Sequence, residues 1–417
     1  MSQTISTEFG NNKYKTKTYK LMSGKTSTVK SRARTISQLI ANQLKELGVE
    51  VTTYVPGHGA NEIFISCNQL LHQDLHISFN EEVAYTIAHG SSLAGKRATC
   101  IIKTHGFEKA ANSIIHSLYS GTTAGFVTLL LDDPDGHHSD NILDIEPLLK
   151  GSQVPYIKTS PGTITEDITS AYQLSEEKQL PYFLLIDSRE IDKQTEQTVS
   201  SLAQTQNKYS RDPYKHIVCP FTAEHLYKVM HSKLNNCEWQ KIIPQKTSLG
   251  SIKLNQLQKN YIEKYSVFFD EFKNLKEVFV TGDASTASMF ALEPYNCIDV
   301  VTYLGCSIPL AVGSYLAGNK NSWSLTGDFA FISAGHLGLI EAFQRNIPIK
   351  VVIFNNCKAG ATGGQDIPNQ LLSVVLAGYK EYIRVIENPL DKELITKTIN
   401  EVNRSDKMEI LVLNYEV

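Results

Sequence analysis

Two short polar motifs at the ends of neighbouring apolar runs constrain the fold of this 417-residue chain most strongly. Gly327-Asp328 follows the run Trp323 to Leu325, and Asn355-Asn356 follows the run Ile349 to Phe354. Between them, Gly335 to Arg345 has apolar residues at helical spacing. The pattern predicts a β-α-β unit with oxygen ligands at both strand ends.

The side chains at these two strand ends suit a hard divalent cation. Mg²⁺ and Ca²⁺ take carboxylate, amide and carbonyl oxygens and complete their shells with phosphate oxygens, so Asp328 and Asn356 are candidate ligands. The small residues Ala359-Gly360-Ala361-Thr362 follow and allow backbone N–H groups to close around anionic oxygens. Turn residues are common at strand ends, which explains either dipeptide alone. In this order, however, they predict a metal site that holds a diphosphate-bearing cofactor.

The composition indicates a soluble protein that acts on a small molecule. Apolar residues make up 41% and charged residues 20% of the sequence, and the net charge of −3 provides no basic surface for nucleic acid. No apolar run is long enough to span a membrane, and the start lacks the apolar core of a signal peptide. The seven cysteines are scattered without a Cys-x-x-Cys pair, so we expect reduced thiols, no zinc or iron–sulfur site, and a cytoplasmic location.

The apolar pattern divides the chain into two α/β domains, because its length exceeds one typical core. Residues 34–190 alternate helices and strands, 191–270 form a polar connector with one amphipathic piece at Glu224 to Met230, and 271–417 resume the alternation. Residues 1–33 are polar and predict a solvated tail, with an organellar presequence as the alternative. The predicted fold class is α/β, with two doubly wound parallel sheets covered by helices on both faces.

The individual elements follow from apolar spacing and from turn residues. The expected strands, besides those of the β-α-β unit, are Val51 to Val55, Ala98 to Lys103, Phe126 to Leu131, Tyr182 to Asp187, Val278 to Thr281 and Ile410 to Leu413. The expected helices of the first domain are Ile36 to Leu47, Glu82 to Leu93 and Ala110 to Tyr119. Parallel α/β sheets place ligands at the carboxyl ends of their strands, so residues that follow these strands are candidates for a site.

Several such residues in the first domain suit acid–base chemistry. His137-His138 follows the strand Phe126 to Leu131, and His105 and His58 follow two other strands. Histidine exchanges protons near neutral pH, so we rank His137 first as a proton donor. A solvated loop of inert histidines is the alternative, since the neighbouring residues favour turns. Glu81 precedes a helix, and the helix dipole alone explains an acid there equally well.

Taken together, these segments resemble the thiamine-diphosphate-dependent 2-oxoacid enzymes, and most closely the large subunit of indolepyruvate ferredoxin oxidoreductase. The resemblance covers most of residues 34–417, including Arg211-Asp212-Pro213 in the connector. The segments that carry it are Phe79-Asn80-Glu81-Glu82-Val83-Ala84, Ser92-Leu93-Ala94-Gly95, Asp132-Asp133-Pro134 through His137, Tyr303-Leu304-Gly305-Cys306-Ser307-Ile308, Gly327-Asp328, and Asn356 with Thr362-Gly363-Gly364-Gln365.

The resemblance implies a thiamine-diphosphate-binding fold in which the first domain binds the pyrimidine and the second binds the diphosphate. A full site forms where domains of the two kinds meet, usually across subunits, so it implies a homodimer. Glu81 matches the glutamate that hydrogen-bonds the pyrimidine N1′, and Asp328, Asn356 and the Lys358 carbonyl match the metal ligands. Ile308 matches the apolar residue that keeps the cofactor bent, and the Cys306 carbonyl would face its 4′-amino group. The other expected cofactor contacts are Gly57, Gly305, Ser307, Gly327, Phe329, Ala359, Gly360, Ala361 and Thr362.

The implied activity is decarboxylation of a 2-oxoacid through an enamine intermediate, which ends in an aldehyde or a carboligation product. A buried glutamate with a raised pKa suits the activation of the cofactor by Glu81. The expected catalytic residues are therefore Glu81, His137, His138 and His105, with thiamine diphosphate and Mg²⁺ or Ca²⁺ as cofactors. The substrate class stays open between aryl, aliphatic and small acidic 2-oxoacids.

The sequence departs from the family in two places. The large subunit of the indolepyruvate enzyme continues into a ferredoxin-like domain, whereas this sequence stops, so we expect that it does not move electrons by itself. The alternative function is the catalytic subunit of a multi-chain 2-oxoacid oxidoreductase whose iron–sulfur clusters lie on a redox partner. Phe329 also replaces the glycine common in the Gly-Asp-Gly form, which changes the backbone freedom of that turn.

Overall fold

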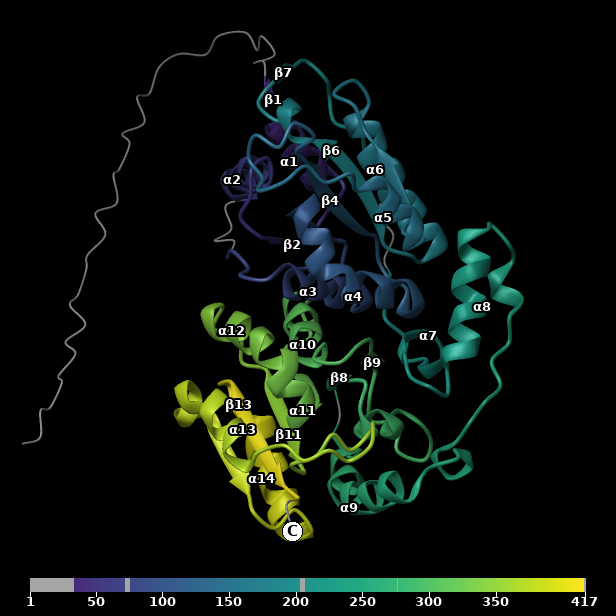
Figure 1. Ribbon diagram of the computed structural model, residues 1–417, viewed down its shortest axis with the longest axis vertical. Coiled ribbons are helices and arrows are strands. Elements are labelled where there is room, and N and C mark those ends of the chain that lie inside the picture. Colours follow the sequence, from purple (N-terminus) through teal and green to yellow (C-terminus); the bar gives the residue numbers. More distant parts are fainter. Residues whose placement is uncertain (1–33, 72–75, 203–206, 276, 416–417) are drawn as a thin grey trace, which may run out of the picture.

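Two parallel β-sheets form the cores of two bodies that are stacked along the long axis of the molecule (Figure 1). The computed structural model describes residues 34–71, 76–202, 207–275 and 277–415. The expected polar tail at 1–33 lies outside the described residues. Within them, no helix is long and apolar enough to cross a membrane.

The first body is a five-stranded parallel sheet with the order β2-β3-β4-β6-β5. Its strands are β2 (Val51–Tyr54), β3 (Ala98–Lys103), β4 (Phe126–Asp132), β5 (Tyr156–Lys158) and β6 (Tyr182–Asp187). Its helices are α1 (Ile36–Glu46), α2 (Ala60–Leu71), α3 (Glu81–Leu93), α4 (Thr104–Ser120), α5 (Glu146–Gly151) and α6 (Ile164–Lys178), followed by the short η1 (Ser188–Glu190). The antiparallel pair β1 (Arg34–Thr35) and β7 (Gln194–Thr195) joins the two ends of this body.

The second body is a six-stranded parallel sheet with the order β12-β13-β11-β10-β8-β9. Its strands are β8 (Phe279–Gly282), β9 (Val300–Val301), β10 (Ser322–Gly327), β11 (Lys350–Asn355), β12 (Ile383–Ile386) and β13 (Glu409–Asn414). Its helical segments are η4 (Thr286–Ala291), α10 (Ser307–Leu316), α11 (Asp328–Ala330), η5 (Phe331–Gly335), α12 (His336–Gln344), α13 (Asn369–Val375), η6 (Ala377–Tyr382) and α14 (Lys392–Arg404).

The strands expected from the sequence are all present within a residue or two of their predicted ends, which confirms the α/β class. The β-α-β unit forms as β10, α12 and β11, and β10 pairs with β11 in parallel register. The strands β5 and β12 were not predicted. Both are short and partly exposed, so they lack the continuous apolar run of a buried strand.

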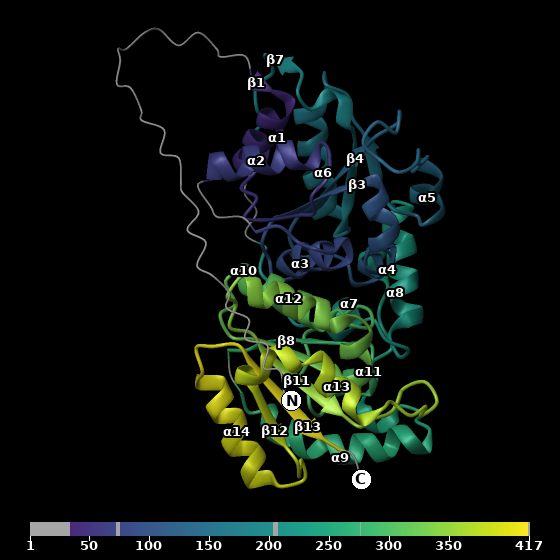
Figure 2. The ribbon, with the colours of Figure 1, turned by 60° about the vertical axis from the view of Figure 1, so that its left-hand side comes forward.

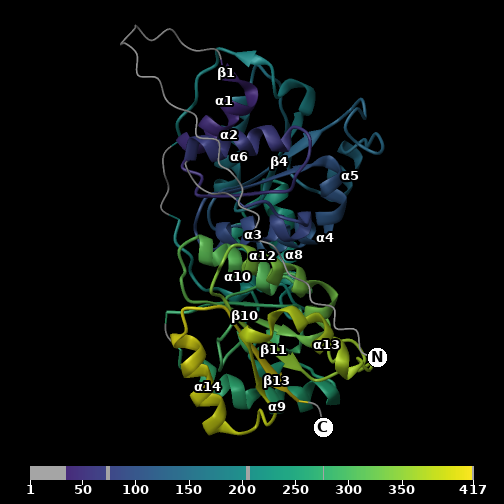
Figure 3. The same cartoon turned by 90° about the vertical axis from the view of Figure 1, so that its left-hand side faces the viewer.

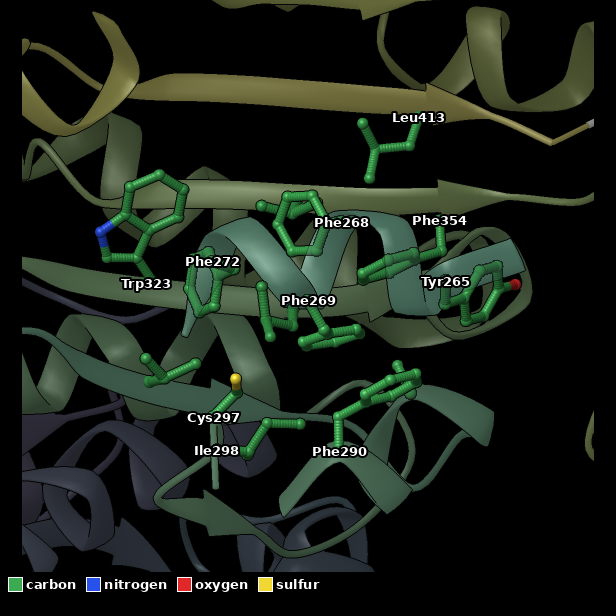
Figure 4. Close-up of a cluster of buried hydrophobic side chains, with 14 of the residues drawn as sticks. Tyr265, Phe268, Phe269, Phe272, Phe290, Cys297, Ile298, Trp323, Phe354 and Leu413 are labelled. Carbon is green, nitrogen blue, oxygen red and sulfur yellow. The ribbon is translucent and has the colours of Figure 1, made fainter. Parts of the chain in front are cut away.

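The connector contains more structure than its polar composition indicates. It holds α7 (Pro213–His216), α8 (Ala223–Leu234), η2 (Trp239–Lys241), η3 (Leu249–Ser251) and α9 (Gln256–Phe272). The expected amphipathic piece is α8. Tyr265, Phe268 and Phe269 of α9 pack in the core of the second sheet against Phe354, and Phe272 packs against Trp323 (Figure 4). A boundary at residue 270 would cut this helix, so we propose that the second domain begins before α9.

The two bodies meet through helices α3 and α10, which lie directly against each other (Figures 2 and 3). A Cβ placed on Gly313 of α10 would lie 2.0 Å from the Ile87 carbonyl oxygen, and one on Gly90 of α3 would lie 2.6 Å from the Leu310 carbonyl oxygen. The Ser91 hydroxyl donates to the Gly313 carbonyl at 2.8 Å. The absence of side chains at two positions therefore sets the close backbone contact between the bodies.

Candidate cofactor site

Asp328 lies where β10 ends and α11 begins, with its carboxylate turned toward the end of β11. Its Oδ1 accepts a hydrogen bond from the Phe329 N–H at 2.8 Å, and its Oδ2 accepts bonds from the N–H groups of Asn356 at 3.2 Å and Cys357 at 2.6 Å. Burial raises the pKa of Asp328 to about 6, against the opposing effect of these N–H groups. The two strand ends of the predicted unit are therefore in contact.

The turn after β11 presents further oxygen atoms on the same side. Asn356 Nδ2 donates to the Tyr265 hydroxyl at 2.8 Å, which orients the amide, and its Oδ1 accepts from the Lys358 N–H at 2.9 Å. Cys357 adopts a φ of 53°, in the left-handed region, so the chain reverses sharply here. The Lys358 carbonyl already accepts from the Gly360 N–H at 2.8 Å and keeps one lone pair for another partner.

These residues line one small pocket in the second body. Of the expected contacts it is lined by Gly327, Asp328, Phe329, Asn356, Lys358, Ala359, Gly360, Ala361 and Thr362. The sequence analysis missed Tyr265, Ala284, Ser285, Thr286, Ala287, Leu304, Ala330 and Phe354, which also line it. The sequence contains a usable signal, because Gly282-Asp283 ends β8 just as Gly327-Asp328 ends β10, and Ala284-Ser285-Thr286 follows it.

The pocket has the chemistry that a metal-bound diphosphate requires. The Ser285 hydroxyl is buried without a hydrogen-bond partner among the described residues, and it lines the same pocket as Asp328. Buried polar groups are ordinarily satisfied, so this donor indicates room for a polar ligand. Within the described ranges no group of three or more His, Cys, Asp or Glu is placed to hold a metal alone. One Asp with amide and carbonyl oxygens therefore needs phosphate oxygens to complete a cation's shell.

Four other expected cofactor contacts, Gly305, Cys306, Ser307 and Ile308, do not line this pocket in the single chain. Ile308 is fully buried in an apolar cluster with Val83 of α3 and Leu339 of α12. The Cys306 carbonyl accepts the Leu310 N–H at 3.0 Å, as the first turn of α10 requires. Ser307 donates its N–H to Asp283 at 2.8 Å, and burial raises the pKa of Asp283.

Glu81 lies in the first turn of α3, at the carboxyl edge of the first sheet. Asn80 caps this helix by accepting the Val83 N–H at 3.2 Å. A Cβ on Gly106 of α4 would lie 2.7 Å from Glu81 Cγ, so the missing side chain leaves space for the glutamate. Gly106 directly follows His105, which brings that histidine to the same region.

The candidate histidines lie at this edge of the sheet, most of them on loops. His58 and His138 stack with ring centroids 3.7 Å apart, and Lys103 Nζ donates to the His138 carbonyl at 2.6 Å beside Gly57. His105 lies in the first turn of α4 rather than on a loop, and its Nε2 is 2.6 Å from Asn141 Oδ1. His137 is exposed. The structure thus brings Gly57, Glu81, His105 and His138 to one sheet edge.

Comparison with known proteins identifies the second body. A model of the thiamine pyrophosphate enzyme C-terminal TPP-binding domain matches residues 281–393, which include the whole β-α-β unit and its pocket. Residues 281–393 therefore form a domain of this thiamine-pyrophosphate-binding family. The chain is 30% identical over 218 residues to indolepyruvate oxidoreductase subunit IorA of Archaeoglobus fulgidus, covering 48% of this chain and 34% of that protein.

A second relative of the same name, from Methanothermobacter thermautotrophicus, is 29% identical over 195 residues, covering 45% of this chain and 31% of that protein. The matches thus span about a third of these relatives' length. Among solved structures, Rhodococcus jostii RHA1 thiamine diphosphate-dependent 4-hydroxybenzoylformate decarboxylase has a TM-score of 0.62 at 13% identity, covering 92% of this chain and 99% of that one. Benzoylformate decarboxylase from Polynucleobacter necessarius has a TM-score of 0.62 at 12% identity, covering 91% and 98%. Likeness at this identity shows the shared fold.

Within the described residues of one chain, the two groups of site residues do not line a common pocket. The pocket of Asp328 is lined by residues from α9 and the second body, whereas Glu81 and the histidines lie on the first body. The pocket encloses about 100 Å³, well below the roughly 300 Å³ at which cofactor sites usually start. This pocket of the single chain is therefore too small to enclose a whole cofactor.

Proposed function

We propose that the chain decarboxylates a 2-oxoacid with bound thiamine diphosphate and Mg²⁺ or Ca²⁺, and releases an aldehyde or a carboligation product. The observation that carries the proposal is the pocket shared by Asp328, Asn356 and the unpartnered Ser285 hydroxyl. Oxygen ligands, a free hydroxyl and a turn of small residues are what a metal-bound diphosphate needs. The fold shared with two benzoylformate-type decarboxylases supports this class of reaction.

The residues of the chain have distinct proposed roles. Asp328, Asn356 and the Lys358 carbonyl hold the cation, and Ser285 donates to a phosphate oxygen. Glu81 hydrogen-bonds the pyrimidine and holds the proton that sets its tautomer. When bound, the cofactor supplies the electron sink for the loss of CO₂. One of the histidines at this edge, His58, His105, His137 or His138, exchanges the proton that completes the product.

A homodimer is part of this proposal, because the pocket and Glu81 lie on different bodies of one chain. A second copy would bring its first body over the pocket and enclose the remainder of the cofactor. Exposed apolar side chains at the start of α3 and on α12 and α13 are available for such a contact, namely Phe79, Ile340, Phe343, Leu371 and Val374. Sedimentation analysis of the purified protein measures directly whether it is a dimer.

The second candidate function is the catalytic part of a multi-chain 2-oxoacid oxidoreductase, with electron acceptors on a partner. The names of the relatives in Archaeoglobus and Methanothermobacter favour it, since both are indolepyruvate oxidoreductase subunits. This candidate requires the same cofactor and the same Glu81. It differs in needing an external electron acceptor for turnover.

The deciding experiment measures CO₂ release from a panel of aryl, aliphatic and acidic 2-oxoacids, with thiamine diphosphate and Mg²⁺ and no electron acceptor. Mass spectrometry identifies the products, and a parallel series contains an artificial acceptor dye. Release of CO₂ with an aldehyde or acyloin supports the decarboxylase. Turnover only with the dye supports the oxidoreductase subunit. Glu81→Gln should suppress both, and an unchanged rate in that variant would refute the role of Glu81.

A further inference from the structure

Residues 76–79 form an irregular segment that immediately precedes the Asn80 cap and Glu81. The first body holds this segment through a bond from the Ser78 N–H to the Tyr54 carbonyl at 2.8 Å. Its other side faces the end of α12, which belongs to the second body (Figure 3). The position of Glu81 therefore depends on contacts between the two bodies.

Glu341 of α12 makes the central contacts with this segment. Its Oε1 accepts the Phe79 N–H at 3.0 Å, and its Oε2 lies 3.2 Å from the Ser78 hydroxyl, which donates to it. These bonds hold one backbone group and one side chain next to the start of α3. Since a carboxylate offers several acceptor sites, one residue can fix two donors at once.

Two neighbours of Glu341 extend the contact to the rest of the segment. Gln344 Nε2 donates to the Ile77 carbonyl at 2.7 Å, and Arg345 Nη2 donates to the Ser78 hydroxyl at 3.0 Å and to the His76 carbonyl at 3.4 Å. Arg345 also pairs with Glu341 at 2.9 Å. Together the three side chains bind each residue from 76 to 79.

The Glu341–Arg345 pair is buried, with side-chain exposures of 2% and 6%. A buried ion pair is weak evidence for stability, because the desolvation of both charges offsets their attraction. The pair instead fixes the orientation of the two side chains, since charge-assisted hydrogen bonds constrain the directions of donor and acceptor. The same helical run begins at Asp328 and continues through α11, η5 and α12, so the segment is tied to the metal-binding end of the second body.

We propose that Glu341 is a positioning residue for Glu81: it fixes the segment 76–79 and thereby the carboxylate that activates the cofactor. The inference rests on the proposed function, which assigns that role to Glu81. Misplacing a catalytic group by about 1 Å can cost about 100-fold in rate, so a small movement of this segment has a large effect. Glu341 itself touches neither cofactor nor substrate.

The test compares Glu341→Leu and Glu341→Gln with a control, Glu409→Gln. Gln keeps an oxygen acceptor for the Phe79 N–H, whereas Leu removes it. Glu409 is also a largely buried carboxylate paired with an arginine, Arg384, but it lies on β13, away from residues 76–79. The first readout is amide hydrogen exchange of the 76–85 peptide in the cofactor-free protein. The second is the rate of deuterium exchange at C2 of bound thiamine diphosphate, beside the Kd of the cofactor.

In Glu341→Leu we expect faster amide exchange at 76–85 and C2 exchange slowed about 10-fold to 100-fold, with the cofactor Kd within about 3-fold. Glu341→Gln should recover most of both rates, and Glu409→Gln should match the wild type. Native C2 exchange in Glu341→Leu, or a loss of cofactor binding as large as the loss of exchange, would overturn the proposal. A wild type that binds no thiamine diphosphate would instead refute the proposed function, whatever the amide exchange shows.

Discussion

Gly313 of α10 lies against Ile87 of α3 so closely that a Cβ at residue 313 would fall 2.0 Å from the Ile87 carbonyl oxygen. The neighbouring backbone atom, the Ser91 nitrogen, would lie 2.8 Å from the same Cβ. Both atoms belong to the main chain, so a change of side-chain rotamer cannot relieve the clash. Gly313 is therefore required by the contact between the two bodies.

Gly313→Ala should loosen or displace this contact and destabilise the protein. Overpacking of a well-packed core usually costs about 1 to 3 kcal/mol, and contact with backbone favours the upper part of that range. Denaturant unfolding followed by circular dichroism measures the loss. Gly151→Ala in α5 is the matched control, because a Cβ there meets nothing within 4 Å. Equal stability of the two variants would contradict this account of α3 and α10.

The sequence predicted local elements well and contacts between elements poorly. β10, α12 and β11 could be predicted because buried strands and an amphipathic helix each leave their own pattern. Neither Gly90 nor Gly313 carried such a signal, since the need for glycine arises only when two distant helices meet. α9 was missed because its buried aromatic residues are separated by polar ones within a polar stretch. The pairing of Asp328 with the 356–357 turn was predictable from strand order, and Ser285 could have been found from its place after Gly282-Asp283. The contacts of Glu341 with residues 78 and 79 depend on how distant elements pack, so no sequence pattern predicts them.

Asp328→Asn should abolish the stabilisation of the protein by its cofactor and metal. A ligand at about 100 times its Kd stabilises a protein by about 2.7 kcal/mol, which a thermal melt resolves easily. We expect the wild type to melt at a higher temperature with thiamine diphosphate and Mg²⁺ together, and the variant to show no such increase. If cofactor and Mg²⁺ raised the melting temperature of Asp328→Asn as much as that of the wild type, Asp328 would not be a metal ligand.

Ser285→Ala should have opposite effects on the free protein and on cofactor binding. The Ser285 hydroxyl is buried and unpartnered in the described part of the chain, so its removal should leave the stability of the cofactor-free protein unchanged or slightly increased. Loss of a charge-assisted bond to phosphate should weaken thiamine diphosphate binding by about 10-fold. Ser324→Ala is the control, since this hydroxyl is also buried and has no partner among the described residues, but it does not line the pocket. Binding titrations that gave equal Kd values for both variants would contradict the assignment.

The three edge histidines should differ in their effect on the product. His105 is held by Asn141 through Nε2, and its Nδ1 is buried without a partner among the described residues. We expect His105→Gln to lower aldehyde release by about 100-fold, within the range for loss of a general acid, and His137→Gln to change it by less than about 3-fold. His138→Gln should lie between them because its ring stacks on His58. Rates with and without an acceptor dye separate proton transfer from CO₂ loss, and a dominant effect of His137→Gln would instead support His137 as the proton donor.

Asp299 should make the stability of the second body depend on pH. Its Oδ2 accepts the Val280 N–H at 2.7 Å, and burial raises its pKa to about 6, partly opposed by that bond and by Arg211. The pKa of Asp299 is thus higher in the folded protein than in the unfolded chain. The contribution of this carboxyl to the unfolding free energy is therefore fully present below the unfolded-state pKa and is lost as pH rises through about 6.

Between pH 5 and pH 7.5 the wild type should therefore lose on the order of 1 kcal/mol of unfolding free energy relative to Asp299→Asn. Asn keeps an oxygen for the Val280 N–H but does not titrate, so the difference between the two proteins isolates this carboxyl from all others. Urea unfolding at several pH values measures it in cofactor-free protein. A difference that is constant with pH, or that grows in the opposite direction, would mean that Arg211 and the N–H donor keep Asp299 ionised despite its burial.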